Sequence, residues 1–162
     1  MYKIVDNFLT GKELAGISRE RGFNPFGYSI HKVPLTGFKA KLFEEASKFV
    51  DLSTTIQAEV WYHNPVFSPL PKKHYDKDEA LHRATGELSF PLVSCILYLK
   101  IGALVGSDLL IEEDVITPKP NRLVLMKPGV EHEVTPWISG TRVSVNMNLW
   151  DKKLHKQAEN HD

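Results

Sequence analysis

The C-terminal two-thirds of the chain alternates between apolar and polar residues with a period of two. Such alternation is typical of β-strands that have one buried face. The runs are separated by Gly, Pro and Asn turns and lie near residues 56–63, 91–100, 107–113, 121–127 and 141–150. The pattern therefore predicts a mostly β core over residues 56–150.

The first 50 residues show a different pattern, a short strand followed by two helices. Thr10 and Glu13 have the spacing of a capping box, which predicts a helix over about 11–21. A second helix is expected over 37–50, where the apolar residues recur at helical spacing. Helices followed by many short strands indicate an α+β domain whose N-terminal helices brace one face of a β-sandwich or jelly roll.

The length of 162 residues is that of about one domain. We expect residues 1–50 to supply the first strand and the supporting helices, and residues 56–150 to form the jelly-roll core. The last segment, 151–162, is almost entirely polar and is predicted to be a frayed tail.

Charge and cysteine content narrow the classes of partner. Twenty Lys and Arg balance twenty Asp and Glu, so the net charge of zero disfavours binding to nucleic acid or to an anionic membrane. No apolar run approaches the roughly 20 residues of a membrane helix. The single cysteine, Cys95, cannot form an internal disulfide or a multi-thiolate zinc site, and a reducing cytoplasm is the expected location.

The residues most able to carry chemistry are His74 and Asp76, followed much later by His132. In an extended segment, side chains two residues apart point to the same side. Two histidines and one carboxylate form the ligand set that suits non-haem Fe(II) and leaves coordination positions open. An isolated H-x-D motif, however, is more often a surface ion pair or a hydrogen-bonded turn.

A second candidate feature is the strictly alternating run over residues 141–150. Its polar positions, Arg142, Ser144, Asn146 and Asn148, share one face. In one interpretation this face is simply solvated. In the other it lines a cavity, where Arg142 is a fixed cation for an anionic ligand and Ser144 adds a hydroxyl donor.

Taken together, these residues resemble the 2-oxoglutarate- and Fe(II)-dependent dioxygenases of the prolyl hydroxylase-like group. In that family H-x-D is followed after a long interval by a histidine. About ten residues later an arginine binds the distal carboxylate of 2-oxoglutarate. The pattern falls here on His74, Asp76, His132 and Arg142, and Ser144 completes an Arg-x-Ser variant.

Two further segments extend the resemblance. The run 94–99 is similar to a family strand whose tyrosine hydroxyl contacts the same carboxylate, which nominates Tyr98. Residues 105–110 are similar to the family's GG-x-L strand, although Ser107 replaces the second glycine.

The family also has a tyrosine on the strand before H-x-D that faces the cosubstrate. Trp61 and Tyr62 both qualify by position, but adjacent residues of a strand face opposite ways. We favour Tyr62 for this role. The neighbouring His63 precedes Asn64 and Pro65 and is expected to be a polar loop residue.

The resemblance implies a double-stranded β-helix, the jelly roll of this family, with Fe(II) held by the H-x-D and distal histidines. It implies 2-oxoglutarate as cosubstrate, converted with O2 to succinate and CO2 while an unactivated C–H bond is hydroxylated. The presence of Asp76 favours hydroxylation over halogenation. No catalytic residue is expected beyond the metal and cosubstrate ligands, and the primary substrate stays open between a protein or peptide residue and a small molecule.

Two alternatives belong to another class. The chain could be a cupin-like metal- or sugar-binding protein, because residues 128–132 superficially resemble a cupin segment, although the order of proline and glycine differs. It could also be a catalytically silent jelly roll used for protein interaction. Under the dioxygenase hypothesis, loops over 64–73 and 77–88 are expected to form the mouth of the site.

Overall fold

The computed structural model describes residues 1–20, 27–66, 69 and 72–159. The helices of this part are α1 (Gly11–Glu20), α2 (Gly37–Ser47), α3 (Glu79–Thr85) and α4 (His155–Glu159). The strands are β1 (Tyr2–Val5), β2 (Tyr28–Lys32), β3 (Gln57–His63), β4 (Val93–Gly106), β5 (Leu109–Ile111), β6 (Asp114–Ile116), β7 (Leu123–Met126), β8 (His132–Val134) and β9 (Trp137–Trp150). None of the described helices is long and apolar enough to cross a membrane.

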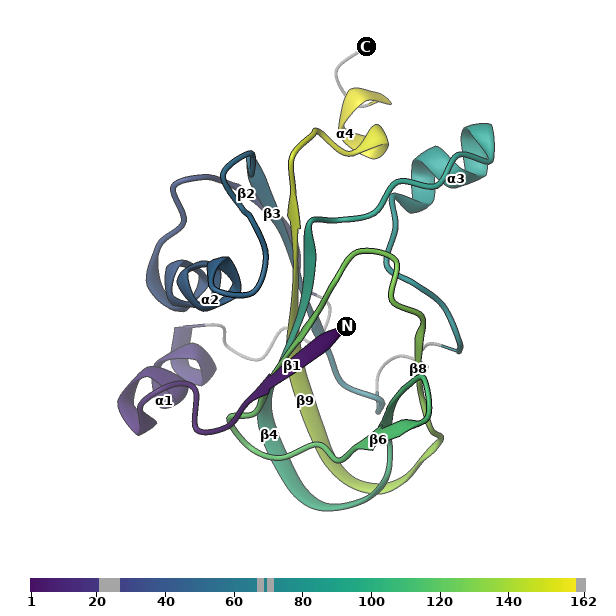
Figure 1. Cartoon of the computed structure of the whole chain (residues 1–162). Helices are drawn as coiled ribbons and strands as arrows, with labels where there is room; N and C mark the ends of the chain where they lie inside the picture. The colour runs from purple at the N-terminus through teal and green to yellow at the C-terminus, as the bar shows by residue number, and fades with distance from the viewer. Residues whose placement is uncertain (21–26, 67–68, 70–71, 160–162) are drawn as a thin grey trace.

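The strands form two antiparallel sheets. One sheet has the order β1-β7-β4-β9-β3-β2 and the other has the order β6-β5-β8. Helices α1 and α2 lie on one side of the larger sheet, and the smaller sheet lies on its other side (Figure 1). The expected α+β arrangement, with N-terminal helices bracing one face of the strands, is confirmed.

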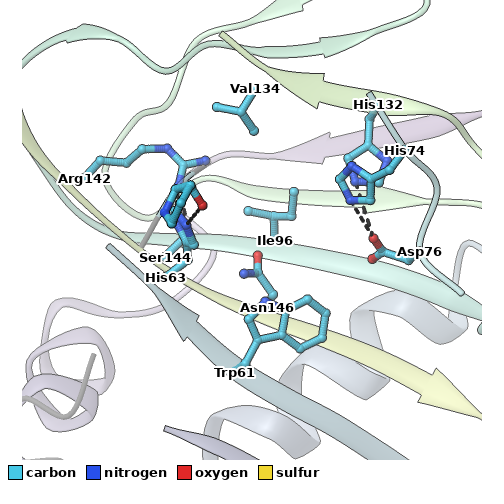
Figure 2. Close-up of a pocket in the computed structure, with 11 residues that line it drawn as sticks. Trp61, His63, His74, Asp76, Ile96, His132, Val134, Arg142, Ser144 and Asn146 are labelled. Carbon is cyan, nitrogen blue, oxygen red and sulfur yellow. Dashed lines mark hydrogen bonds and ion pairs between the residues drawn. The ribbon is translucent and has the colours of Figure 1, made fainter. Parts of the chain in front are cut away.

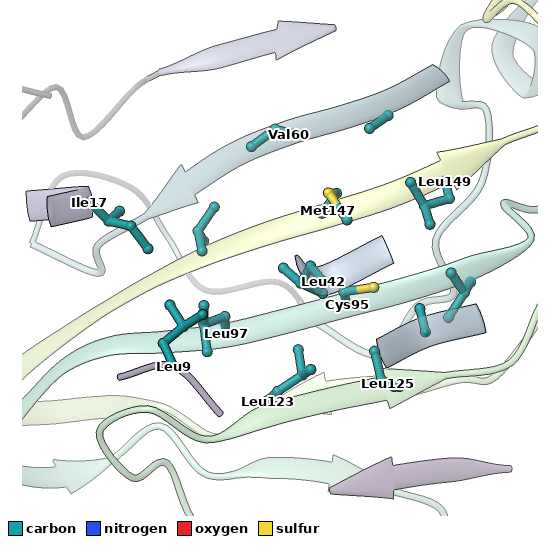
Figure 3. Packing of buried hydrophobic residues seen from close by; sticks show 14 of the residues in the cluster. Leu9, Ile17, Leu42, Val60, Cys95, Leu97, Leu123, Leu125, Met147 and Leu149 are labelled. Carbon is teal, nitrogen blue, oxygen red and sulfur yellow. The ribbon is translucent and has the colours of Figure 1, made fainter. Parts of the chain in front are cut away.

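The main core lies between the larger sheet and the two N-terminal helices. From β9 it receives Val145, Met147 and Leu149, which are at most 1% exposed. Leu42 and Ala46 of α2 also belong to it and are completely buried; Figure 3 shows Leu42 packed against the sheet. The apolar half of the alternating run 141–150 therefore faces the helices.

A second apolar cluster fills part of the space between the two sheets. Ile96 and Tyr98 of β4 contribute to it from the larger sheet, and Leu109 and Ile111 of β5 from the smaller one. Because β4 supplies both clusters, residues 93–98 are buried on both faces. The polar face of β9 faces the same space between the sheets.

The capping box at the start of α1 is confirmed. The Thr10 amide donates to Oε1 of Glu13 at 2.9 Å, and the Glu13 amide donates to Oγ1 of Thr10 at 3.2 Å. Glu13 also accepts a hydrogen bond from Lys41 of α2 at 2.8 Å. The hydrogen bond from Lys41, and to a smaller extent those with Thr10, lower the pKa of the Glu13 carboxyl to about 2. This contact joins the two helices; residue 21, the expected end of α1, lies outside the described residues.

The segment 77–88 was expected to be a loop, and this was wrong, because most of it is the helix α3. Asp78 caps its first turn by accepting a hydrogen bond from the Leu81 amide at 3.1 Å. Gly86 ends it in the left-handed conformation with φ 75°.

The prediction of a frayed tail was also wrong for the described residues up to 159. Leu154 is 4% exposed, and α4 follows it. Oδ2 of Asp78 accepts from the His155 amide at 2.9 Å and pairs with Lys152 at 3.2 Å. The same carboxylate thus caps α3 and anchors the tail, a long-range contact that local composition does not reveal.

The backbone at position 106 requires a residue without a side chain. Its φ is +81°, and an added Cβ would lie 2.1 Å from the carbonyl oxygen of Pro136. We predict that Gly106→Ala lowers the free energy of unfolding by about 3 kcal/mol, through backbone strain and displacement of β9. Urea denaturation measures this change.

Gly11→Ala is the matched control, because an added Cβ there meets nothing within 4 Å. It should change the free energy of unfolding by less than about 1 kcal/mol. Equal effects of the two substitutions would contradict the proposed steric cause.

Candidate functional site

A two-residue backbone pairing brings the distant histidines together. The His74 amide donates to the His132 carbonyl at 2.9 Å, and the His132 amide donates to the His74 carbonyl at 2.8 Å. Such a doubly bonded antiparallel pair places both side chains on the same side. The segment before α3 is thereby fixed against the edge strand β8.

The two imidazoles and a carboxylate surround one point. Nε2 of His74 lies 3.3 Å from Oδ1 of Asp76, and Nε2 of His132 lies 3.5 Å from the same oxygen. The ring centroids are 4.4 Å apart. The expected same-side placement of His74 and Asp76 therefore holds, and the ligand atoms of all three residues lie within 4.8 Å of one another.

The backbone selects one tautomer of each ring. Nδ1 of His74 donates to the Lys72 carbonyl at 2.6 Å, and Nδ1 of His132 donates to the Val130 carbonyl at 3.0 Å. Because a carbonyl can only accept, Nδ1 of each ring carries a proton, which leaves Nε2 as the nitrogen that faces Asp76 and that can bind a metal once it is deprotonated. This is the arrangement by which outer partners orient metal-binding histidines.

The protonation states follow from burial and from mutual contact. A hydrogen bond with Asp76 raises the pKa of His74, while burial lowers the pKa of His132. Burial alone would raise the pKa of Asp76, but hydrogen bonding to His74 and the charges of both imidazoles lower it overall. Asp76 is therefore an anionic carboxylate at neutral pH.

This donor set fits a divalent metal ion. Within the described part of the chain, the only ion-pair partners of Asp76 are the two imidazoles. Two imidazole nitrogens, each able to ligate once its proton is lost, and one carboxylate oxygen on one side of a point suit Fe(II) and leave further positions for other ligands. The arrangement can thus hold iron without any rearrangement of the ring tautomers.

The trio lies at one end of a cavity of about 240 Å³ between the sheets. Figure 2 shows His74, Asp76 and His132 on one side and Arg142, Ser144 and His63 on the other, with Trp61, Ile96 and Asn146 between them. The cavity has the character of a small-molecule site, an apolar middle with a few polar groups at its ends.

Arg142 is a buried cation that has no ion-pair partner in the part of the chain that the structure describes. It is 3% exposed, and no carboxylate of the described residues lies within ion-pair distance. Its Nη1 donates to Oγ of Ser144 at 3.4 Å, and its buried Nε has no hydrogen-bond partner in the described part of the chain. Burial lowers the pKa of Arg142, but a guanidinium stays charged in proteins. The site therefore presents an uncompensated positive charge.

The polar face of β9 is thus enclosed. Arg142, Ser144 and Asn148 are at most 3% exposed. The interpretation in which this face lines a cavity agrees with the structure, and the solvated-strand interpretation does not.

Tyr98 lies directly beside this cation. It is completely buried, its Cα is paired in register with that of Ser144, and its ring centroid is 5.3 Å from Cζ of Arg142. Burial raises the pKa of the phenol, so it is neutral and able to donate. Its hydroxyl forms no hydrogen bond of good geometry among the described residues, and its closest polar interaction is with Arg142. The predicted position of Tyr98 near the arginine agrees with the structure.

The expectation that Tyr62 faces the cosubstrate was wrong. Tyr62 is 8% exposed and belongs to the helix-facing core with Ala58 and Val60, whereas Trp61 lines the cavity. Strand alternation is the reason, since β3 pairs Trp61 with Asn146 on the polar side of β9.

His63 is a cavity residue that the sequence interpretation missed. It was expected in a loop, but it is the last residue of β3, opposite Ser144, and it lines the cavity. Its two-residue spacing from Trp61 is the signal that could have found it.

The two segments expected at the mouth behave differently. From 64–73, Pro69 lines the cavity among the described residues. The described residues 77–88 do not line it, because α3 packs toward the C-terminal end of the chain.

Solved structures share this architecture. A Pseudomonas putida prolyl-4-hydroxylase matches with a TM-score of 0.66 and 18% identity, over 92% of this chain and 84% of that one. A 2OG-Fe(II) oxygenase family protein from Burkholderia pseudomallei matches with a TM-score of 0.63 and 11% identity, over 94% of this chain and 86% of that one. The viral collagen prolyl hydroxylase vCPH from Paramecium Bursaria Chlorella virus-1 matches with a TM-score of 0.62 and 16% identity, over 91% of this chain and 89% of that one.

A further match, NgTET1 in complex with 5mC DNA, has a TM-score of 0.57 and 11% identity, over 99% of this chain and 79% of that one. No family model matches the sequence, and no curated protein does. At these identities the similarity concerns the fold. The expected double-stranded β-helix is confirmed as the fold of 2OG-Fe(II) oxygenases, and the H-x-D and distal histidine trio is present in it.

We predict that the chain binds one Mn(II), an oxygen-stable substitute for Fe(II), and that Asp76→Ala weakens the affinity more than about 100-fold. Loss of an outer partner alone costs about 10–100-fold. A protonated imidazole cannot ligate, so the affinity should fall as the pH is lowered through the pKa of His74, which lies above its ordinary 6.5. Isothermal titration calorimetry at several pH values measures both effects.

Glu133→Gln is the control, because it removes a carboxylate next to His132 in sequence that is not part of the trio. It should bind Mn(II) as the wild type does. Undiminished binding by Asp76→Ala would show that the metal binds elsewhere.

Proposed function

We propose that the chain is an Fe(II)- and 2-oxoglutarate-dependent dioxygenase that hydroxylates an unactivated C–H bond. This proposal rests on one observation: the two ends of a single cavity differ. One end has a metal-ligand trio and the other has the buried cation Arg142. A dicarboxylic 2-oxo acid has matching ends, since one end can chelate a metal and the other is a carboxylate. The shared fold supports the same assignment.

In this proposal His74, Asp76 and His132 hold the iron, and the Lys72 and Val130 carbonyls keep the rings in the ligating tautomer. When bound, iron would supply the oxidative chemistry that couples decarboxylation of 2-oxoglutarate, to succinate and CO2, with transfer of an oxygen atom from O2 to carbon.

The other residues bind and orient the cosubstrate. Arg142 would pair with its distal carboxylate, with the Ser144 and Tyr98 hydroxyls as further hydrogen-bond donors. Trp61 and Ile96 form the apolar wall between the two ends and keep bulk water from the reacting atoms.

For the primary substrate we propose a protein or peptide residue or a small molecule. The fold does not decide between substrate classes, because its matches include prolyl hydroxylases and a protein solved with 5mC DNA. The zero net charge of this chain argues against a nucleic acid. The cytoplasmic location expected from the single cysteine stays a prediction.

The deciding experiment is an anaerobic titration with Fe(II) and 2-oxoglutarate, followed by the visible metal-to-ligand charge-transfer band. We expect the band only when both are added. Arg142→Ala should weaken 2-oxoglutarate binding about 100-fold, because it removes charge-assisted hydrogen bonds in a buried site. Aerobic succinate formation is the second readout.

Lys100→Ala removes an exposed cation from the neighbouring strand β4 and should leave the titration unchanged. A wild-type protein that gives no band would favour the cupin-like interpretation. A band without succinate formation, even with a broad range of substrates, would favour a catalytically silent binding protein.

A further inference from the structure

His63 connects the buried cation to the cavity wall. Its Nδ1 lies 3.4 Å from Nη1 of Arg142, and its Nε2 lies 3.2 Å from the Pro69 carbonyl oxygen. The histidine belongs to β3, the arginine to β9, and Pro69 to the segment that follows β3. One imidazole therefore contacts two separate parts of the cavity lining.

The partners fix the tautomer of this ring. A guanidinium can only donate, so Nδ1 of His63 must carry a lone pair. A carbonyl can only accept, so the proton sits on Nε2 and is donated to Pro69. Burial, together with the charge of Arg142, lowers the pKa of His63, which agrees with a neutral ring.

The described groups that contact Arg142 are all neutral. Nη1 is 3.4 Å from both Nδ1 of His63 and the Ser144 hydroxyl, and Cζ lies over the Tyr98 ring, 5.3 Å from its centroid. Such partners restrict the orientation of a cation while leaving its charge uncompensated. A ligand that meets a pre-oriented cation loses less free energy on binding.

We propose that His63 is a positioning residue, whose Nδ1 lone pair orients Arg142 toward the distal carboxylate of the 2-oxo acid and whose Nε2 proton holds the ring against Pro69. The inference rests on the proposed function. Under this inference His63 is not a metal ligand, and through Arg142 it favours ligands that have a second carboxylate.

Three substitutions test the roles of Nδ1 and Nε2 of His63 separately. His63→Asn places an amide oxygen near the position of Nδ1 and keeps the acceptor for Arg142. His63→Gln places an amide nitrogen near the position of Nε2 and keeps the donor for Pro69. His63→Phe removes both polar atoms and retains a planar ring.

The measurement is calorimetric titration of the Mn(II)-loaded full chain with 2-oxoglutarate, and with 2-oxobutyrate, which lacks the distal carboxylate. For 2-oxoglutarate we expect His63→Gln and His63→Phe to weaken the affinity about five- to tenfold, the scale of one hydrogen bond to a charged group. His63→Asn should stay within about twofold of the wild type. All four proteins should bind 2-oxobutyrate alike, which a merely structural defect would not allow.

Equal binding of 2-oxoglutarate by all four proteins would overturn the inference while leaving the proposed function intact. The same holds if His63→Asn loses as much affinity as His63→Phe, or if 2-oxobutyrate binding falls in parallel. A wild-type chain that binds Mn(II) but not 2-oxoglutarate would overturn both proposals.

Discussion

The alternation of side chains along β9 is the constraint on which both the core and the site depend. Val145, Met147 and Leu149 face the helices, so the residues between them must face the smaller sheet. A one-residue shift in register would place Arg142 in the apolar core and expose the apolar side chains to the cavity. Stability and site geometry are therefore specified by the same strand, because neither face can change without the other.

This arrangement places costly groups in the interior. A buried guanidinium without a carboxylate partner is unfavourable, and so is a buried carboxylate without a metal or a permanent cation beside it. The two apolar clusters, which share β4, offset that cost with burial of leucine, valine and isoleucine side chains. Polar groups kept in such a place are more stable when an ion or ligand of opposite charge is bound.

The sequence was sufficient for the features that depend on periodicity and on paired motifs. Alternation predicted β3, β4 and β9. The two-residue spacing of His74 and Asp76 predicted that they share one side, and the ligand set with the family resemblance added His132. It failed where distant parts of the chain decide the local structure. The helix α3 and the ordered tail depend on Asp78, whose carboxylate joins segments more than 70 residues apart. The choice of Tyr62 followed the resemblance, although the strand's own pattern of Ala58, Val60 and Tyr62 already indicated an apolar face.

The contacts of Asp78 also bear on where substrate selection resides. An insertion after H-x-D is a natural candidate for a selective loop, yet α3 is tied through Asp78 to Lys152 and His155, away from the cavity. The helix is therefore held by the C-terminal segment and does not line the cavity. Under the proposed function, the described residues placed to distinguish primary substrates are those of the cavity wall between the two charged ends, above all Trp61 and Asn146. Because these two lie opposite each other on β3 and β9, a change at either position alters the same part of the cavity, and substrate preference should depend on the pair rather than on the insertion.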